Sequence, residues 1–164
     1  MLKILSSFHA LQFRQLSDVY EDSNCQLGHM RYRNEHEAQQ LLMAEQDLYS
    51  YLKEFYKMQG AYCAVWQEGD MYISALRIEP FRDGLLLSGL ETIPHMRRRG
   101  YGLQLVKAVL EDIRSCTTLP VYSHIDKSNV ASLFLHEKAG FVRISDQATF
   151  LDGSVQNSAY TLKF

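Results

Sequence analysis

One pattern occurs three times between residues 61 and 93: a run rich in β-branched, aromatic and aliphatic residues, followed by a break. The three runs cover residues 61–66, 71–78 and 85–93, and Gly69 and Gly84 lie in the two short turns between them. Short turns that contain glycine are typical of antiparallel hairpins. The sequence therefore predicts an antiparallel three-stranded meander, and every other element has to be arranged around it.

Segments with a helical spacing of apolar residues flank the predicted meander. Before it, the pattern predicts a helix from about residue 8 to about residue 25, which Gly28 ends, and a longer helix from Asn34 to Gly60. After it, Pro94 closes the third strand and a helix is predicted up to about residue 114. Four aromatic residues of the long helix are expected in the core or on its flank, namely Tyr49, Tyr51, Phe55 and Tyr56.

Shorter elements complete the chain. The pattern predicts strands at residues 2–5 and 120–125 and a helix at residues 129–138. Two last strands follow, at residues 141–144, extending towards Leu151, and at residues 159–164. The chain has no internal repeat, low-complexity run or linker. We therefore expect one α+β domain over residues 1–164, with a mixed, mostly antiparallel sheet of about seven strands and about four helices.

Composition disfavours several classes of function. The 164 residues are 46% hydrophobic and 22% charged, and the formal net charge is −2, whereas a nucleic-acid-binding domain is usually more basic. No apolar run approaches the 18 or more residues that a membrane span needs. The three cysteines lie far apart and have neither CxxC nor metal-type spacing. We expect a cytoplasmic protein that binds no nucleic acid, no membrane and no metal ion.

A basic, glycine-containing loop connects the third strand of the meander to the next helix. It reads Pro-His-Met-Arg-Arg-Arg-Gly-Tyr-Gly over residues 94–102. Free backbone N–H groups at the start of a helix, together with the helix dipole, form an anion site. Gly100 and Gly102 let the backbone approach a phosphate closely, and the arginines at 97–99 add positive charge. The loop therefore predicts phosphate binding.

Other interpretations of this loop remain open on the motif alone. It could be a glycine-rich turn with a solvated basic cluster. A Rossmann site fits less well, because the loop follows an antiparallel meander and Leu105 stands where a third glycine would be needed.

A second group of polar residues follows at helical spacing. Asn129, Ser132 and His136 occupy positions i, i+3 and i+7, so one helical face presents an amide, a hydroxyl and an imidazole. Gly140 and Phe141 come directly after this helix.

Taken together, the two motifs make the chain resemble the GNAT superfamily of acetyl-CoA-dependent N-acetyltransferases over nearly its whole length. The family loop, written Q/R-x-x-G-x-G/A after a strand that ends near a proline, matches Arg97, Gly100 and Gly102 behind Pro94. The later family pattern of an asparagine, a small residue, an aromatic position and Gly-Phe matches residues 129–141, with histidine where the family most often has tyrosine.

The resemblance implies a GNAT-like fold and acetyl-CoA as co-substrate. It places the pyrophosphate on the backbone of Arg97, Arg98, Arg99, Gly100, Tyr101 and Gly102. The pantetheine arm would pair with the backbone of Leu90, Glu91 and Thr92, and the thioester would lie where this strand diverges from the strand at 120–125. Asn129, with Ser132, would steady the pantetheine or the catalytic helix.

Three residues are candidates for acid–base catalysis. His136 occupies the position of the family tyrosine that protonates the departing thiolate, and its unperturbed pKa near 6.5 lets an imidazole hold a proton near neutrality. For the base, His124 comes first because it lies on the strand beside the expected gap. Glu91 comes second, because strand alternation could turn it away from the acceptor. Capping, ion pairing, or a water chain in place of a dedicated base remain alternatives.

The acceptor side is expected along the first two helices and their connection, residues 20–33, and at the turn 152–157. Glu21 and Asp22 could attract an amine, whereas Arg31 and Arg33 could hold a carboxylate or phosphate, and all four could be solvated loop charges. The leading hypothesis is direct acetyl transfer to the primary amine of a small molecule or peptide by a monomer or homodimer. A non-catalytic acyl-CoA sensor and a general phosphate or nucleotide binder are the alternatives.

Overall fold

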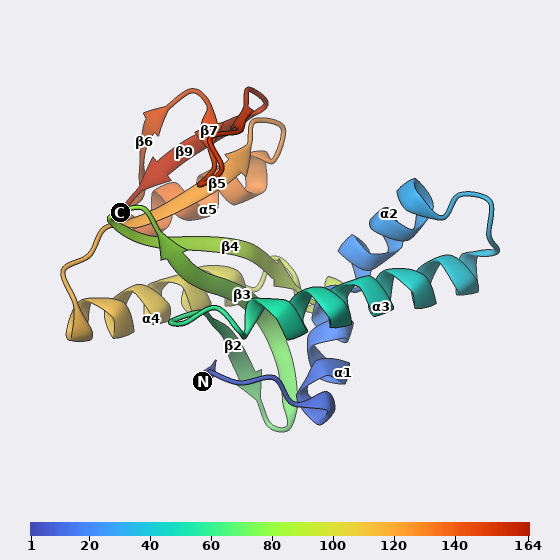
Figure 1. Ribbon diagram of the computed structural model, residues 1–164. Helices are drawn as coiled ribbons and strands as arrows, with labels where there is room; N and C mark the ends of the chain where they lie inside the picture. Colours follow the sequence, from blue (N-terminus) through green and yellow to red (C-terminus); the bar gives the residue numbers. More distant parts are fainter.

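The computed structural model describes all residues, 1–164, and has a seven-stranded sheet at its centre (Figure 1). The strands follow the order β1-β2-β3-β4-β5-β9-β6, and every neighbouring pair is antiparallel except β4 and β5, which are parallel. The strands are β1 (Leu2–Leu5), β2 (Tyr62–Glu68), β3 (Met71–Phe81), β4 (Gly84–Thr92), β5 (Val121–Asp126), β6 (Val142–Ser145) and β9 (Ala159–Lys163). The predicted meander is thus confirmed as β2, β3 and β4.

Five α-helices flank the sheet. They are α1 (Ala10–Val19), α2 (Glu21–Arg31), α3 (Glu37–Phe55), α4 (Tyr101–Cys116) and α5 (Val130–Ala139). A 3₁₀ turn, η1 (Pro94–Met96), links β4 to the loop before α4, and a small hairpin of β7 (Ala148–Thr149) and β8 (Val155–Gln156) follows β6. No helix is long and apolar enough to cross a bilayer.

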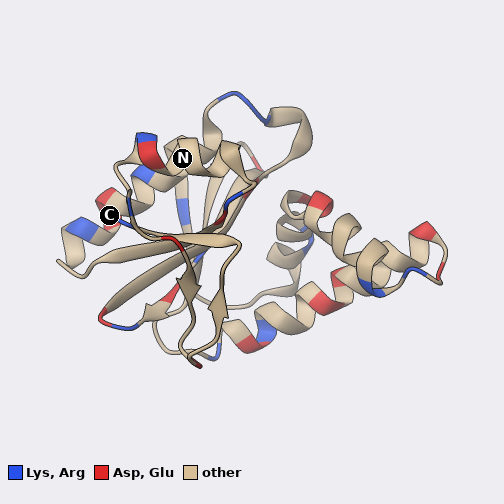
Figure 2. Ribbon diagram, turned by 90° about the horizontal axis from the view of Figure 1, so that it is seen from above, with Lys and Arg blue, Asp and Glu red and all other residues tan.

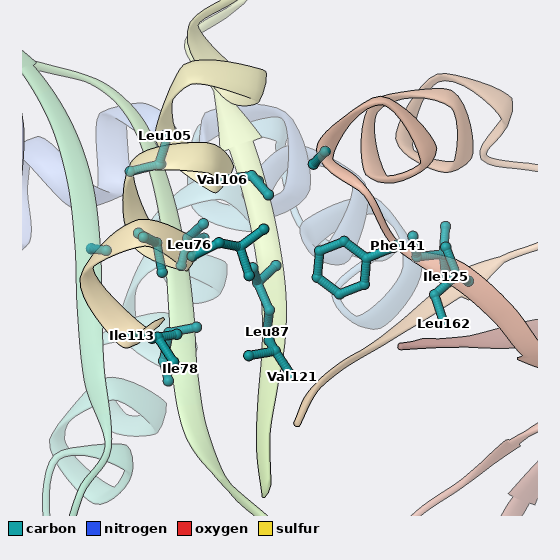
Figure 3. Packing of buried hydrophobic residues seen from close by; sticks show 14 residues of the cluster. Leu76, Ile78, Leu87, Leu105, Val106, Ile113, Val121, Ile125, Phe141 and Leu162 are labelled. Atoms are coloured by element: carbon teal, nitrogen blue, oxygen red, sulfur yellow. The ribbon is translucent and has the colours of Figure 1, made fainter. Parts of the chain in front are cut away.

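The helices divide between the two faces of the sheet. On one face α4 packs leucine, valine and isoleucine side chains against apolar residues of β3, β4 and β5, such as Leu76 and Leu87 (Figure 3). On the other face α1 and α3 pack Leu16 and Leu52 against β2 and β3. Helices α2 and α3 lie side by side and extend beyond the sheet, with acidic and basic positions on both (Figures 1 and 2).

The first predicted helix is wrong in its extent. The chain forms two helices there, because α1 ends at Val19 and α2 begins at Glu21. Gly28 does not end the helix: it lies inside α2, where a Cβ atom would come within 2.7 Å of the Gln40 carbonyl oxygen. The glycine therefore permits close packing of α2 on α3.

The boundaries of two other elements also differ from the prediction. Helix α3 begins after His36, not Asn34, and ends at Phe55, before Gly60. The strand predicted to extend towards Leu151 stops at Ser145, because the chain turns there into the separate β7–β8 hairpin. The predicted α+β class and seven-stranded, mostly antiparallel sheet are confirmed, and the division of the first helix raises the helix number from four to five.

Candidate active site

The parallel strands β4 and β5 stay paired for only three residues. Their register runs from Leu85 opposite Val121 to Leu87 opposite Ser123, and beyond this point the strands part. Between them lies a hollow of about 160 Å³, lined by both strands and by α5. We call this hollow the slot. Strands that part at their carboxyl ends leave backbone N–H and C=O groups free to bind a ligand.

Gly89 causes β4 to depart from regular geometry at the mouth of the slot. Its φ is +58°, and the β3–β4 register shifts between Ala75 and Arg77, opposite this glycine. The Tyr20 hydroxyl donates a 2.8 Å hydrogen bond to the Gly89 carbonyl oxygen. A Cβ atom at this position would collide with the Arg77 guanidinium, so both the backbone angle and the packing require glycine.

The loop before α4 presents a continuous set of free backbone donors. No acceptor within the chain pairs with the amide N–H groups of residues 98–103. Two residues of the loop have left-handed backbone angles, Arg98 at φ +60° and Gly100 at φ +86°. Successive N–H groups in such a conformation, at the N-terminus of a 16-residue helix, form an anion-binding concavity.

The three arginines of this loop have different environments. Arg97 turns back from the loop: its guanidinium pairs with Asp22 on α2, and its Nε donates a 2.9 Å hydrogen bond to the Thr92 carbonyl oxygen. Arg98 and Arg99 have no ion-pair partner. Positive charge available to an anion at the loop therefore comes from Arg98 and Arg99, while Arg97 connects the loop to helix α2.

The polar face predicted on residues 129–136 is present on α5. Asn129 caps the helix by accepting a 3.1 Å hydrogen bond from the Ser132 backbone N–H. Both residues line the slot together with His136. The capping bond fixes where α5 begins, and so where its polar face lies relative to β5.

His136 is almost wholly buried, with 1% of its surface exposed. Its Nδ1 lies 2.8 Å from the Ser132 carbonyl oxygen, which can only accept, so Nδ1 carries a proton. Its Nε2 lies 3.3 Å from the Ser123 hydroxyl oxygen. Burial lowers the pKa of His136 from its usual value, which favours the neutral ring, and the Nε2 of that tautomer is an acceptor with no proton to give.

His124 borders the slot, but its ring lies on the opposite face of β5 from Ser123, as strand alternation requires. Its ring packs edge-on against Phe81 and Phe150, with centroid distances of 5.3 and 5.1 Å. Both ring nitrogens are buried and have no hydrogen-bond partner. Burial, with a smaller effect from Arg82, lowers the pKa of this imidazole.

The Glu91 side chain points to the face of the sheet that carries α1, α2 and α3. Strand alternation alone had left the direction of this side chain open. Its carboxylate accepts a hydrogen bond from the Ser23 hydroxyl on α2. Burial raises the pKa of the Glu91 carboxyl, against the opposing effects of the Ser23 hydrogen bond and Arg97. Glu91 lines a second hollow, of about 370 Å³, between strands β3 and β4 and the helices α2 and α3.

This second hollow, which we call the helical pocket, brings together residues that are distant in the sequence. Arg31 lines it and pairs at 3.0 Å with Asp47, which also accepts a 2.7 Å hydrogen bond from the Tyr32 hydroxyl. Gly89 lines both the pocket and the slot, so the two hollows meet at the irregular point of β4. The residues around the pocket are Tyr20, Ser23, Asn24, Leu27, Arg31, Asp47, Leu48, Tyr51, Arg77, Gly89 and Glu91.

Other residues expected on the acceptor side lie elsewhere. Asp22 is engaged with Arg97, Glu21 borders a separate surface hollow, and Arg33 is in the turn after α2. The turn 152–157 belongs to the β7–β8 hairpin and lines neither hollow. Arg77 and Gly89 were not among the predicted site residues, although a single basic side chain inside a mostly apolar strand is a signal that could have identified Arg77.

Comparison with known proteins identifies the family. The sequence profile of the Acetyltransferase (GNAT) family matches residues 16–141, which include the helical pocket, the slot and the loop. This chain belongs to the GNAT acetyltransferase family. Acetyl-CoA is the co-substrate of this family, and its members act on amines of small molecules or proteins. A search of curated proteins gave no match.

Solved GNAT structures share the fold. PaiA N-acetyltransferase from Thermoplasma acidophilum, crystallised with coenzyme A, is 11% identical, with a TM-score of 0.68 over 99% of this chain and 98% of its own. Ribosomal-protein-alanine N-acetyltransferase from Brucella melitensis is 15% identical, with a TM-score of 0.69 over 100% and 98%. An acetyltransferase from Streptococcus agalactiae is 16% identical, with a TM-score of 0.67 over 99% and 96%.

The residues of this GNAT chain fit a coenzyme A thioester. Free amides at 98–103 and the unpaired Arg98 and Arg99 suit phosphate groups, which accept hydrogen bonds and carry negative charge. The slot suits a narrow polar chain, because the parted strands offer backbone groups along its length.

Proposed function

We propose that this protein is an N-acetyltransferase that moves the acetyl group of acetyl-CoA directly to the primary amine of a small molecule or peptide. The observation that carries the proposal is the meeting of two hollows at Gly89. One hollow lies beside the anion-binding loop and α5, and the other holds a carboxylate suited to an amine. A sensor of acyl-CoA would need the first hollow and would have no use for the second.

The co-substrate is expected to bind through backbone groups. Amides of the loop, up to Gly102, would hold its phosphates with help from Arg98 and Arg99, and the backbone of residues 90–92 would pair with the pantetheine arm. Asn129 and Ser132 would keep α5 in place at the slot. When bound, acetyl-CoA supplies an acetyl group that is already activated as a thioester.

Glu91 is the base that the geometry favours. Its raised pKa brings a carboxylate closer to the working pH, and its negative charge attracts an ammonium group. Ser23 holds the carboxylate in place. His124 is the weaker candidate, because its neighbours are Phe81 and Phe150 and the nearby Arg82 repels a cation.

In the transfer, the bond between the acetyl carbon and sulfur breaks and a bond from that carbon to the amine nitrogen forms. The bound ammonium gives one proton to Glu91, which frees the nitrogen lone pair for attack. The second proton, lost as the amide forms, goes to solvent, and the sulfur leaves as a thiolate that takes a proton from solvent. His136 lacks a proton on Nε2 in its neutral form, so we assign it a positioning role. Its Nδ1–H donates to the Ser132 carbonyl oxygen, and its ring lies against Ser123 of β5, whose hydroxyl donates to the Leu87 carbonyl oxygen.

Residues 1–164 are proposed to work as one acyltransferase domain. The support is that β1 and β9, from the two ends of the chain, belong to the same sheet. A cytoplasmic location and a monomeric or dimeric state remain predictions from the sequence.

The test is thiol release from acetyl-CoA with a panel of amines, amino acids, polyamines and peptides, using the wild type, Glu91→Gln, His124→Gln and His136→Ala. We expect release that depends on one class of amine and falls at least about a hundredfold in Glu91→Gln, as for loss of a general base. Tight acetyl-CoA binding without release from any amine would contradict the transferase and support the sensor. A larger loss in His124→Gln than in Glu91→Gln would transfer the role of base to His124.

A further inference from the structure

Arg77 is a partly buried cation without a partner in the chain. It lies on β3 among buried apolar neighbours, and its Nε is buried with no hydrogen-bond partner. No carboxylate lies within 4.0 Å of its guanidinium, and none of its nitrogens makes a hydrogen bond within the chain. An arginine cannot relieve this situation by losing its proton.

A charge that is largely removed from water without a partner destabilises the folded state, so proteins rarely keep one without a function. Glu79 and Glu91 are the acidic groups whose charges act on Arg77, and both lie beyond ion-pair distance. The guanidinium is therefore partly balanced in charge, but its buried Nε–H has no acceptor, and its other donors have no acceptor within the chain. A bound anion would supply one.

The guanidinium is held rigidly in position. The rings of Tyr20 and Tyr51 lie 5.5 and 5.0 Å from it, in the geometry of cation–π contacts. It also packs against the backbone of Gly89, which leaves no room for a side chain there. A planar fork that is fixed in this way loses little entropy when it binds a carboxylate with two parallel hydrogen bonds.

Arg77 and Glu91 both line the helical pocket. Arg31, the other arginine of this pocket, is already paired with Asp47, so Arg77 is the cation left for a ligand. The pocket thus offers a positive site and a negative site within about 370 Å³, a volume suited to a small molecule.

From this arrangement we propose that Arg77 binds a carboxylate of the acceptor, and that the acceptor is a small zwitterion, a free amino acid or similar aminocarboxylate, whose amine lies towards Glu91. This inference rests on the proposed acetyl transfer. It adds the class of acceptor, since an amine without a carboxylate would leave the Arg77 guanidinium without an acceptor in the pocket.

The experiment compares pairs of acceptors that differ only in the carboxylate. Each standard L-amino acid that supports thiol release is assayed beside its amide, with the wild type, Arg77→Gln, Arg77→Lys and the control Lys53→Gln on the exposed face of α3. We expect kcat/KM in the wild type to be at least about tenfold higher for the acid than for the amide, as for a charge-assisted hydrogen-bond pair. Arg77→Gln should lose this preference, so that its kcat/KM for the acid falls to about that for the amide. Arg77→Lys, which keeps the positive charge but not the planar guanidinium, should retain only part of the preference for the acid.

A binding measurement separates this inference from the proposed function. Calorimetry with N-acetylated amino acids, the expected products, requires no turnover, and thermal unfolding with acetyl-CoA affinity shows whether each variant is folded. Product binding to the wild type but not to folded Arg77→Gln, without any thiol release, would retain the carboxylate site and contradict the transferase. Equal rates with acid and amide, or no binding of any N-acetyl amino acid, would overturn the inference even if other amines are acetylated.

Discussion

The Tyr20 hydroxyl donates to the Gly89 carbonyl oxygen at 2.8 Å, and this bond ties the junction of α1 and α2 to the irregular point of β4. Tyr20 is 2% exposed, and its ring also borders the Arg77 guanidinium. The Tyr20 side chain thus contacts both β4, at Gly89, and Arg77, the residue proposed to bind the carboxylate. It fixes the position of both relative to helices α1 and α2.

Removing this hydroxyl should weaken both stability and acceptor binding. For Tyr20→Phe we expect the free energy of unfolding in urea to fall by about 0.5–1.5 kcal/mol, since the Gly89 carbonyl oxygen loses its hydrogen-bond donor. The KM for the acceptor should rise more than the Kd for acetyl-CoA. Tyr49→Phe, at an exposed side chain of α3, is the control, and equal effects of the two substitutions would contradict the role given to Tyr20.

Two glycines with similar backbone angles allow strain to be separated from collision. Gly89 has φ +58° and packs against Arg77, whereas Gly69 has φ +54° and open space where a Cβ would be. Gly69→Ala should cost about 1 kcal/mol, the cost of the left-handed angle. Gly89→Ala should cost clearly more and reduce activity, because the guanidinium must move. The check is chemical unfolding of both variants, and similar losses would show that Arg77 is not confined by Gly89.

The raised pKa of Glu91 predicts how activity and stability change with pH. The carboxylate must be ionised to accept a proton, so kcat/KM should fall as pH decreases through a pKa above the usual value near 4.3. Because the folded-state pKa is above the unfolded one, stability from this group is present below the unfolded pKa and is lost as pH rises through the folded pKa. Glu91→Gln should therefore lose activity but not stability at neutral pH.

Ser23 provides a second test of the same carboxylate. Its hydrogen bond lowers the Glu91 pKa, so Ser23→Ala should move the acidic limb of the pH–rate profile to higher pH. Ser7→Ala, on the segment before α1, should leave the limb in place. A profile that is the same in wild type and Ser23→Ala would remove Glu91 from the proposed mechanism.

The stability that His136 contributes should decrease as pH falls, whereas that of Glu91 decreases as pH rises. Its folded-state pKa is lowered, so its contribution is present above the unfolded pKa near 6.5 and is lost as pH falls through the folded pKa. The wild type should therefore lose stability between about pH 7 and pH 5, and His136→Gln should lose less over this interval. Urea unfolding at both pH values measures the difference. A kcat limb that follows the His136 pKa would instead indicate an acid role.

The basic loop gives a prediction about acetyl-CoA. Arg98→Ala and Arg99→Ala should each weaken acetyl-CoA binding several-fold, with a smaller effect at high salt because exposed charges are screened. Arg97→Ala should act mainly on the acceptor KM, since its side chain pairs with Asp22 on α2. Calorimetric Kd values at two salt concentrations distinguish these cases. The expected order would be contradicted if Arg97→Ala alone weakened acetyl-CoA binding.

Features encoded within short stretches of sequence were predictable. The meander, the loop at 94–102 and the polar face at 129–136 each depend on a few neighbouring residues, and all three are present in the structure. The break at Tyr20 was not predicted, because neither glycine nor proline marks it and the apolar spacing continues. Gly28 was misinterpreted because the reason for a glycine there is distant in the sequence: the Gln40 carbonyl oxygen of α3 leaves no room for a Cβ atom.

The helical pocket could not be predicted for the same reason. Tyr20, Arg77 and Glu91 belong to three separate elements, and only packing brings them together. The protonation of His136 was also beyond the sequence, since it depends on the Ser132 carbonyl one turn earlier pointing at Nδ1. Position along the chain identified the candidates, but their roles depend on contacts that the sequence does not display.

The slot and the helical pocket lie towards opposite faces of one sheet and share only Gly89. Two substrates that approach in this way have separate entrances, and neither obstructs the other on arrival. The steady-state kinetics should therefore show intersecting double-reciprocal lines with no compulsory order, and each product should inhibit competitively only against the substrate whose entrance it uses.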